Sequence, residues 1–398
     1  MQKWLGTFAL CACLTSLGTA QTGPSTQQTF TAKEATVTRQ GPTSDYERLT
    51  PLIPGAKVVV GERKGDWYRS VQSGVWLDSR TGTLNPGAVA PAQLKNATLD
   101  SFPNGDARLT LTASAVPEIQ AKHSPSTGVL TLRLVSTEDL IFELVKPTGH
   151  ADFLHSVSVR PDGDDTVIEV VSGPHALGGY ALEPGGKPGE VVLRFRKPTP
   201  KAWKDLIITL DAGHGGPSDP GTVGHGGLAE KVLNLRVTEA LATKLRALGA
   251  TVVMTRTADA DVAPDDKGAS AELQARVDVS VEKQAHLFLS LHHNARPDVE
   301  EGKISHGTDI YYYHPISEKF AQALADPIAD AIAEPLRTSR FRSFHVIRQS
   351  FSPSVLVEFQ YLANPTLEKS VLDTKGYPEK AADGVVKGLE AYLRSLPY

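Results

Sequence analysis

Two patterns of apolar and polar positions divide the chain. From about residue 34 to residue 200, short runs alternate apolar and polar side chains, as in 107–114 and 129–135, and turn residues separate the runs. A period of two buries one face of a strand and leaves the other face in water, which is typical of antiparallel sheets. This part of the chain is therefore predicted to form one or two all-β domains.

A different pattern begins at about residue 204, where apolar strand-like runs alternate with segments of helical spacing. Apolar residues from Leu233 to Leu248 recur at intervals of three or four, and Gly249 follows as an expected C-terminal cap. Such alternation predicts an α/β fold with a mostly parallel sheet that helices cover on both faces. The expected helices are 230–248, 271–284, 317–333 and 378–396, and the expected strands lie within 206–213, 250–256, 287–295, 308–314, 344–349 and 353–362.

The N-terminus has the composition of an export signal. Lys3 precedes an apolar stretch that ends at Leu17, and small residues follow it. This order predicts a secretory signal peptide at 1–20, followed by a polar linker at 21–33. The alternatives are an uncleaved anchor and a lipoprotein signal at LCAC, which would leave a very short apolar core. We expect an exported protein of the periplasm, cell envelope or extracellular space, without a stable membrane span once the signal is removed.

Composition narrows the classes of function and of metal ligand. A chain of 398 residues exceeds the usual size of a single core, so two or three domains are expected. The net charge of -4 leaves no basic excess to neutralise phosphates, which argues against a nucleic-acid partner. Both cysteines, Cys11 and Cys13, lie in the signal segment. The mature chain therefore offers only histidine and carboxylate side chains to a metal.

Four side chains near expected strand ends are candidates for chemistry. His214 stands between glycines that let a ligand approach closely. One alternative is a structural histidine. Another is an anion-binding loop, but the residue spacings of a P-loop and of a dinucleotide-binding loop are missing. Glu230 opens a helix, where helix electrostatics alone also favours an acidic residue. His292 ends one apolar strand, and Glu358 interrupts another, where a structural ion pair is the alternative.

Together, two histidines and two carboxylates near strand ends suggest a mononuclear zinc site. Ligands of α/β sheets bind at the carboxyl ends of the strands. A catalytic zinc takes three protein ligands and a water, and a separate carboxylate can move the proton of that water to the leaving group. A ligand set of two histidines and one glutamate is not exclusive to zinc.

Several motifs resemble, in order, those of the type 3 family of zinc-dependent N-acetylmuramoyl-L-alanine amidases. They are LDAGHGGPSDPGTVGHGGLAEKVLNL, VVMTR, LSLHHNA, GTDIYYY and PSVLVEFQYLANP. The resemblance implies a zinc amidase catalytic domain at 204–398, in which His214, Glu230 and His292 bind one Zn²⁺ and Glu358 is catalytic. It also implies a peptidoglycan hydrolase that cleaves the amide between N-acetylmuramic acid and L-alanine of the stem peptide, in cell-wall remodelling or daughter-cell separation.

The β region resembles two modules that accompany such enzymes. Residues 34–82 are similar to a bacterial SH3-like module, with Trp67 and Trp76 at its two aromatic positions, and 92–197 are weakly similar to an AMIN-type β domain. These modules would hold the enzyme on peptidoglycan or connect it to division-machinery or envelope partners. The alternative is a single irregular β scaffold without a binding role.

The sequence departs from the family pattern in places. His293 stands where the family usually has a small residue. It could be a neighbour of the metal ligands or an alternative ligand. Successive strand residues point to opposite faces, and the motif places His292 rather than His293 at the ligand position. His225, in the loop before Glu230, could reach the site, but we expect its side chain to be exposed to solvent. EFQYLAN replaces the commoner Gly and Phe after the glutamate. Residues 314–350 have room for one ordinary helix and a loop, so we expect no inhibitory helix and a site that is open without an activator.

Two other functions suit these residues. A zinc peptidase, or another hydrolase of the stem peptides, would use the same metal site, because the site suits any amide. An inactive wall-binding protein that keeps the fold is the non-enzymatic alternative.

Overall fold

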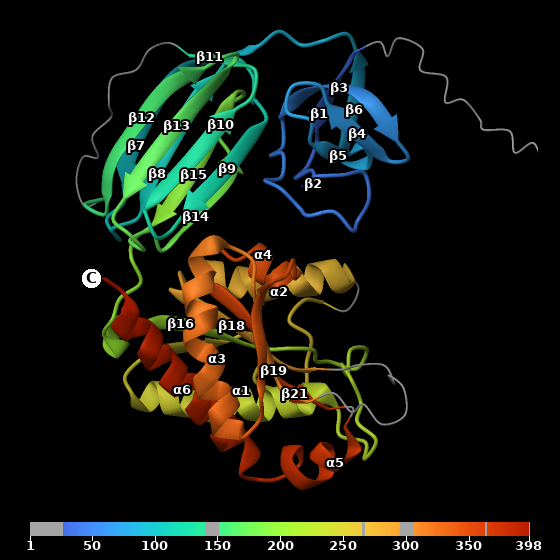
Figure 1. The fold of residues 1–398 in the computed structure, drawn as a ribbon, viewed down its shortest axis with the longest axis vertical. Helices are drawn as coiled ribbons and strands as arrows, with labels where there is room; N and C mark the ends of the chain where they lie inside the picture. Colours follow the sequence, from blue (N-terminus) through green and yellow to red (C-terminus); the bar gives the residue numbers. More distant parts are fainter. Residues whose placement is uncertain (1–26, 140–150, 265–266, 295–305, 363, 398) are drawn as a thin grey trace, which may run out of the picture.

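The computed structural model describes residues 27–139, 151–264, 267–294, 306–362 and 364–397 (Figure 1). In these residues, a β-rich part precedes a mixed α/β part, as the hydrophobic pattern predicts. The predicted signal peptide at 1–20 lies outside the described residues. In the described part of the chain, no helix is both long enough and apolar enough to cross a membrane.

The first β sheet begins earlier than expected. Its order is β2-β5-β4-β3-β1-β6, and the strands are β1 (Gln28–Ala32), β2 (Thr38–Arg39), β3 (Lys57–Lys64), β4 (Trp67–Ser70), β5 (Trp76–Asp78) and β6 (Gly82–Pro86). The predicted linker at 21–33 is therefore wrong for residues 28–32. Phe30 is fully buried and pairs with Val58 of β3 and Leu84 of β6. Threonines flank Phe30 and make the segment look polar, yet threonine is itself favoured in strands.

Two further sheets make up the rest of the β part. Their orders are β12-β13-β10-β9 and β11-β7-β8-β15-β14. The strands are β7 (Ala92–Ser101), β8 (Ala107–Ala113), β9 (Ile119–Ser124), β10 (Val129–Leu134), β11 (Thr137–Asp139), β12 (Leu154–Asp162), β13 (Asp165–Ser172), β14 (Gly179–Pro184) and β15 (Glu190–Arg196). One apolar cluster contains inward residues of all three sheets, such as Phe30, Leu109 and Leu132. The β part therefore shares one core.

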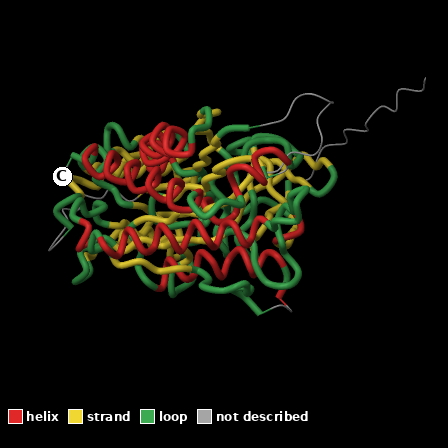
Figure 2. Tube along the Cα trace, turned by 90° about the horizontal axis from the view of Figure 1, so that it is seen from below, coloured by secondary structure: helices red, strands yellow, loops and turns green. Residues whose placement is uncertain are grey.

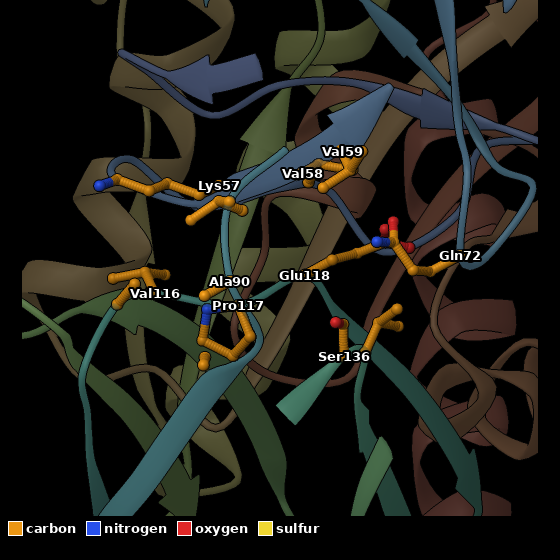
Figure 3. A pocket seen from close by; sticks show the side chains of 13 residues that line it. Lys57, Val58, Val59, Gln72, Ala90, Val116, Pro117, Glu118 and Ser136 are labelled. Atoms are coloured by element: carbon orange, nitrogen blue, oxygen red, sulfur yellow. The ribbon is translucent and has the colours of Figure 1, made fainter. Parts of the chain in front are cut away.

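The junction within the β part contains a small pocket (Figure 3). Its lining combines residues of β3, such as Lys57 and Val58, with residues before β9, such as Val116 and Glu118. The carboxylate of Glu118 accepts a hydrogen bond from the hydroxyl of Ser70 at 3.1 Å. The candidate residues of the sequence analysis are not part of this lining.

The α/β part is built on a sheet of order β17-β16-β18-β21-β19-β20. Neighbouring strands are parallel, except that β19 is antiparallel to β21. The strands are β16 (Ile207–Ala212), β17 (Thr251–Met254), β18 (Leu287–Asn294), β19 (Thr308–Tyr312), β20 (Leu336–Phe341) and β21 (Ser354–Tyr361). The helices are α1 (Glu230–Ala247), α2 (Ala269–Glu282), α3 (Glu318–Ile332), α4 (His345–Arg348), α5 (Pro365–Leu367) and α6 (Tyr377–Ser395).

Helices lie on both sides of this sheet (Figures 1 and 2). Helices α1, α3 and α6 share an apolar cluster with one face, which includes Leu233, Phe320 and Leu389. Helices α2 and α4 form a smaller cluster with the other face, where Val277 and Ile347 contribute. The sheet is thus the middle layer, and its carboxyl ends remain available for a site.

One local prediction is wrong near the edge of the sheet, and one strand there was not predicted. Residues 344–349 were expected as a strand but contain α4, because Val346 and Ile347 are both buried in one helical turn rather than alternating. The sequence LRTSRF of β20 shows no apolar alternation, so the strand was not predicted. An edge strand has a neighbour on one side only and often carries charged residues, so it needs no such alternation. Between 313 and 353, where the backbone is fully described, α3 is the one helix longer than a single turn. This stretch matches the expected single ordinary helix.

Replacing Phe30 with alanine should lower the free energy of unfolding by about 3 to 5 kcal/mol, because the change leaves a cavity in the shared β core. Urea unfolding of the full chain measures this effect. Thr31→Ala, on the neighbouring and more exposed position of β1, is the matched control and should cost less than about 1 kcal/mol. Equally small effects for the two variants would show that residues 28–32 behave as a linker.

Candidate metal centre

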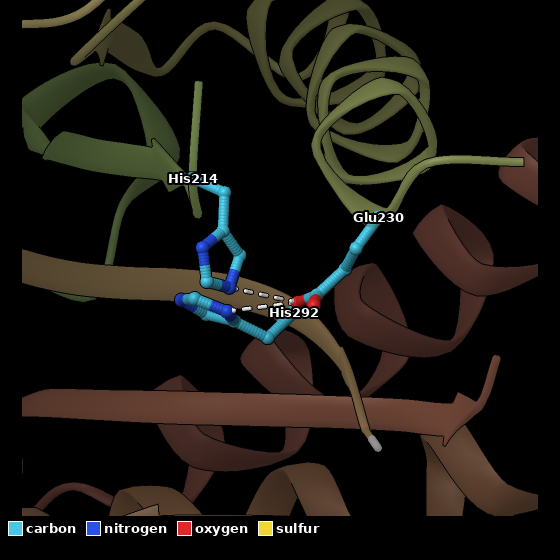
Figure 4. Close-up of side chains that lie close together, drawn as sticks. All are labelled: His214, Glu230 and His292. Atoms are coloured by element: carbon cyan, nitrogen blue, oxygen red, sulfur yellow. Dashed lines mark hydrogen bonds and ion pairs between the residues drawn. The ribbon is translucent and has the colours of Figure 1, made fainter. Parts of the chain in front are cut away.

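Three side chains from three elements converge at the carboxyl end of the sheet (Figure 4). His214 follows β16, Glu230 is the first residue of α1, and His292 lies in β18. Their ligand atoms all lie within 4.8 Å of one another. Oε1 of Glu230 is 3.3 Å from Nε2 of His214 and 3.1 Å from Nδ1 of His292. The structure therefore brings together the three residues that the sequence predicts as metal ligands.

Glycines leave the space that these side chains occupy. A Cβ atom on Gly213 would lie 2.1 Å from Cε1 of His292. A Cβ atom on Gly221 would lie 2.7 Å from both Oε2 of Glu230 and Cδ2 of His214. Both distances are far inside van der Waals contact, so a larger residue would displace the cluster. The glycines of this loop thus make room for the imidazoles and the carboxylate.

His214 has an unusual backbone conformation for a residue with a side chain. Its φ of 61° lies in the left-handed region, which costs a non-glycine residue about 1 to 2 kcal/mol. Two contacts hold it there: Arg276 Nη2 donates to the carbonyl of His214 at 3.0 Å, and Oδ1 of Asp219 lies 2.8 Å from Nδ1 of His214. Strain of this kind persists where the surroundings impose it, typically at functional sites.

A buried ion pair fixes the start of the same loop. Arg276 of α2 lies 2.8 Å from Oδ1 of Asp211, and both side chains are almost fully buried. Burial would raise the pKa of Asp211, but the charge of Arg276 and a hydrogen bond from Ser290 lower it below its usual range. Arg276 also donates to the carbonyl of Ala212 at 2.9 Å. The Arg276 guanidinium therefore connects the end of β16 to the loop of His214.

Glu230 is ionised within this cluster. Burial would raise the pKa of its carboxyl, but hydrogen bonds and charges from His214 and His292 lower it far below its usual range. Its second oxygen, Oε2, accepts the backbone N–H of Thr222 at 2.9 Å. An ionised carboxylate among two imidazoles is a donor set that fits a divalent cation such as zinc.

His293 points to the opposite face and lies outside this ligand group. Its Nδ1 is 2.7 Å from Oδ1 of Asn234, and its Nε2 is 2.9 Å from the hydroxyl of Tyr377. Burial lowers the pKa of His293 to about 3, so the ring is neutral. Asn234 in turn donates to Oε1 of Glu230 at 3.3 Å. His293 is therefore a neighbour of the ligands, while His225 is exposed on the loop before α1.

Glu358 lies beside the cluster on the next strand. It is the Cα partner of His292, so the two side chains share one face of the sheet. Burial, with the charges of Glu230 and Asp309, raises the pKa of Glu358 well above its usual range. Its Oε2 is buried and has no hydrogen-bond partner among the described residues. A carboxyl group of this kind, next to a candidate metal-binding cluster, is suited to carry a proton.

The sequence analysis missed the residues that hold the ligands in place. Glu368 is buried, and its two oxygens accept the backbone N–H groups of Gly226 at 2.7 Å and Leu228 at 3.0 Å, which secures the loop before Glu230. Asp211 had a usable signal, since it is a charged residue at the end of an apolar strand, as Glu358 is. Glu368 had no comparable signal in its local sequence.

Comparison with known proteins assigns the α/β part to a family. A family profile described as N-acetylmuramoyl-L-alanine amidase matches residues 208–391. The germination-specific N-acetylmuramoyl-L-alanine amidase of Bacillus subtilis is 33% identical over 205 residues, which cover 50% of this chain and 84% of that protein. The amidase LytC of the same species is 34% identical over 191 residues, or 47% of this chain and 35% of that protein.

A solved structure covers the same region. The catalytic domain of CwlV, an N-acetylmuramoyl-L-alanine amidase from Bacillus (Paenibacillus) polymyxa var. colistinus, is 30% identical, with a TM-score of 0.42. The alignment covers 48% of this chain and 99% of that chain. Because the profile runs from β16 to α6 and the germination-specific relative is matched over most of its length, this chain belongs to the N-acetylmuramoyl-L-alanine amidase family of enzymes.

Proposed function

We propose that this protein is a zinc-dependent peptidoglycan hydrolase that cleaves the amide between N-acetylmuramic acid and L-alanine of the stem peptide. The observation that carries the proposal is the convergence of His214, Glu230 and His292 next to Glu358. The named relatives, among them the germination-specific amidase, support the choice of bond.

The donor set fits one zinc ion. Two imidazoles and one ionised carboxylate come from three separate elements, and Asp219 orients the ring of His214 through Nδ1. A zinc ion held there would supply Lewis-acid activation of a water molecule and of the scissile carbonyl. The orphaned Oε2 of Glu358 is the additional polar group expected beside such a site.

Glu358 carries the proton in this proposal. Its carboxylate accepts a proton from the attacking water and then donates it to the amine nitrogen of L-alanine, as a general base and then a general acid. A C–O bond forms as the C–N bond breaks, which leaves a free lactyl carboxyl on the glycan and a free α-amine on the peptide. The raised pKa of Glu358 supports the acid half of this cycle.

We also propose a place for the protein in the cell. The signal peptide at 1–20 would export it to the periplasm or cell envelope, where it would act in cell-wall remodelling or daughter-cell separation. The SH3-like module at 34–82 and the AMIN-like domain at 92–197 would hold it on peptidoglycan or recruit division-machinery partners. Probable cell wall amidases named LytH, from staphylococci, are among the similar proteins.

Purified protein should release stem peptides from isolated peptidoglycan without an added activator. Mass spectrometry of the products should find free lactyl groups on the glycan and stems that begin with L-alanine. A chelator should abolish release, and added zinc should restore it, because the ligand group is incomplete as a catalyst without its metal. Shortened stems on intact muramic acid would instead identify a zinc peptidase. No release by the zinc-loaded protein would favour a wall-binding role.

Glu358→Gln should lower kcat by about 10²- to 10⁴-fold while zinc content stays unchanged, because the amide keeps the shape of the side chain but cannot carry the proton. Metal analysis and turnover on the same preparation measure both quantities. Glu239→Gln, at an exposed glutamate of α1, is the matched control and should retain full activity. Loss of zinc together with activity would instead make Glu358 a metal ligand.

His293→Phe should lower the free energy of unfolding by about 2 to 4 kcal/mol, because it leaves buried groups of Asn234 and Tyr377 without their partner. Zinc stoichiometry should stay unchanged, since His293 is not in the ligand group. Thermal unfolding and metal analysis give the two results. His225→Phe, at an exposed position, is the control that should alter neither. Loss of zinc from His293→Phe at normal stability would restore His293 as an alternative ligand.

A further inference from the structure

Polar side chains extend from the candidate metal centre toward the edge of the sheet. His292, Glu358 and Asp309 are successive Cα partners on β18, β21 and β19. Such partners share one face of a sheet. Arg340, on the edge strand β20, forms an ion pair with Asp309. Neither Asp309 nor Arg340 has a part in metal binding or in the proton transfer proposed above.

The Arg340 guanidinium is held in a defined position. Asp309 is 1% exposed and also lies 3.3 Å from Nδ2 of Asn294 and 3.3 Å from the hydroxyl of Tyr361, so its carboxylate is fixed. The Cζ atom of Arg340 lies 5.7 Å from the centroid of the Tyr311 ring, which supports the flat guanidinium from another side. Two contacts thus orient a group that already has few internal degrees of freedom.

One N–H of this guanidinium is unpaired among the described residues. Its Nε is buried and has no hydrogen-bond partner among the described residues, although leaving a buried N–H unpaired is costly. The side chain nevertheless keeps 35% of its surface exposed, so a ligand can reach the exposed part of the side chain, although Nε itself is closed to solvent.

We propose that Arg340 binds a carboxylate of the substrate on the peptide side of the scissile amide. This inference rests on the proposed function and adds to it a substrate class, namely stems in which the residue after L-alanine carries a free carboxylate. A planar guanidinium is the side chain best suited to carboxylates, which it binds through two parallel N–H groups. Asp309 and Tyr311 would act as positioning residues for it.

Distance and charge both favour this assignment. Strands β20 and β21 are separated by β19, so their backbones lie roughly 10 Å apart at about 4.8 Å per strand spacing, and the Arg340 side chain returns part of that way to Asp309. One residue of extended peptide spans about 3.5 Å, which brings the carboxylate of the next residue within reach. Asp309 would otherwise repel an anionic stem at this end of the site, so a cation is needed on the side where the stem lies.

Two synthetic glycan peptides test this proposal if they differ only in the residue after L-alanine, which carries either a free carboxylate or the carboxamide. The wild type should prefer the carboxylate form in kcat/KM by about tenfold to a hundredfold. Arg340→Gln should abolish that preference by raising KM for the carboxylate form, with little change for the carboxamide. Arg342→Gln, at an exposed arginine beyond β20, is the matched control and should keep the wild-type preference.

Arg340→Lys separates substrate binding from support of Asp309, and it also decides the question if Arg340→Gln does not fold. Lysine keeps the ion pair but lacks the two-pronged geometry, so the preference should fall while the carboxamide is cleaved normally. Equal losses on both substrates in Arg340→Gln, restored by lysine, would overturn the proposal in favour of a structural role. Equal cleavage of both substrates by the wild type would overturn it and leave the amidase intact. Cleavage of neither by zinc-loaded wild type would overturn the proposed function itself.

Discussion

A buried negative charge at the start of α1 is the constraint around which the α/β part is arranged. The Glu230 carboxylate is 3% exposed, and an unpaired charge in that position would cost several kcal/mol. The cost is offset by donors from separate segments: both imidazoles of the ligand group, the backbone N–H groups of Thr222 and His293, and the amide of Asn234. The hydrogen bonds that the Glu230 carboxylate requires therefore fix the relative positions of β18, α1 and the glycine-rich loop.

The rest of the site follows from this requirement. His214 reaches Glu230 from a left-handed backbone. Arg276 supplies a hydrogen bond that holds His214 there, and Asp211 holds Arg276. Glu368 does the same for the other end of the loop through two backbone N–H groups. The loop of His214 and the loop before Glu230 are thus held by residues of other elements, an arrangement that would limit the reorganisation needed on metal binding.

The proximity of His214, Glu230 and His292 could be predicted from the sequence, but most of the contacts that hold their loops could not, for a physical reason. His214, Glu230 and His292 stand at recognisable places, next to glycines, at a helix start and at a strand end, so local pattern locates them. The pairs Asp211–Arg276 and Gly226–Glu368 join residues 65 and 142 positions apart, and no local period records such contacts. The same limit explains β1 and α4, whose burial depends on elements that are distant in sequence. Most strands and helices of the α/β part were predictable because each repeats its own apolar period, which β20 and α4 do not.

The charges on the face of Glu358 connect proton transfer with substrate binding. Burial raises the pKa of Glu358, and the neighbouring charges of Glu230 and Asp309 raise it further. Arg340 compensates Asp309 on one side, and a divalent cation held by Glu230 would compensate the other. A substrate carboxylate bound to Arg340 would neutralise part of the positive charge of Arg340. The negative charge near Glu358 would then be less compensated, which would raise the pKa of Glu358 further. By linkage, binding of an anionic stem and uptake of the proton of the attacking water by Glu358 would then favour each other.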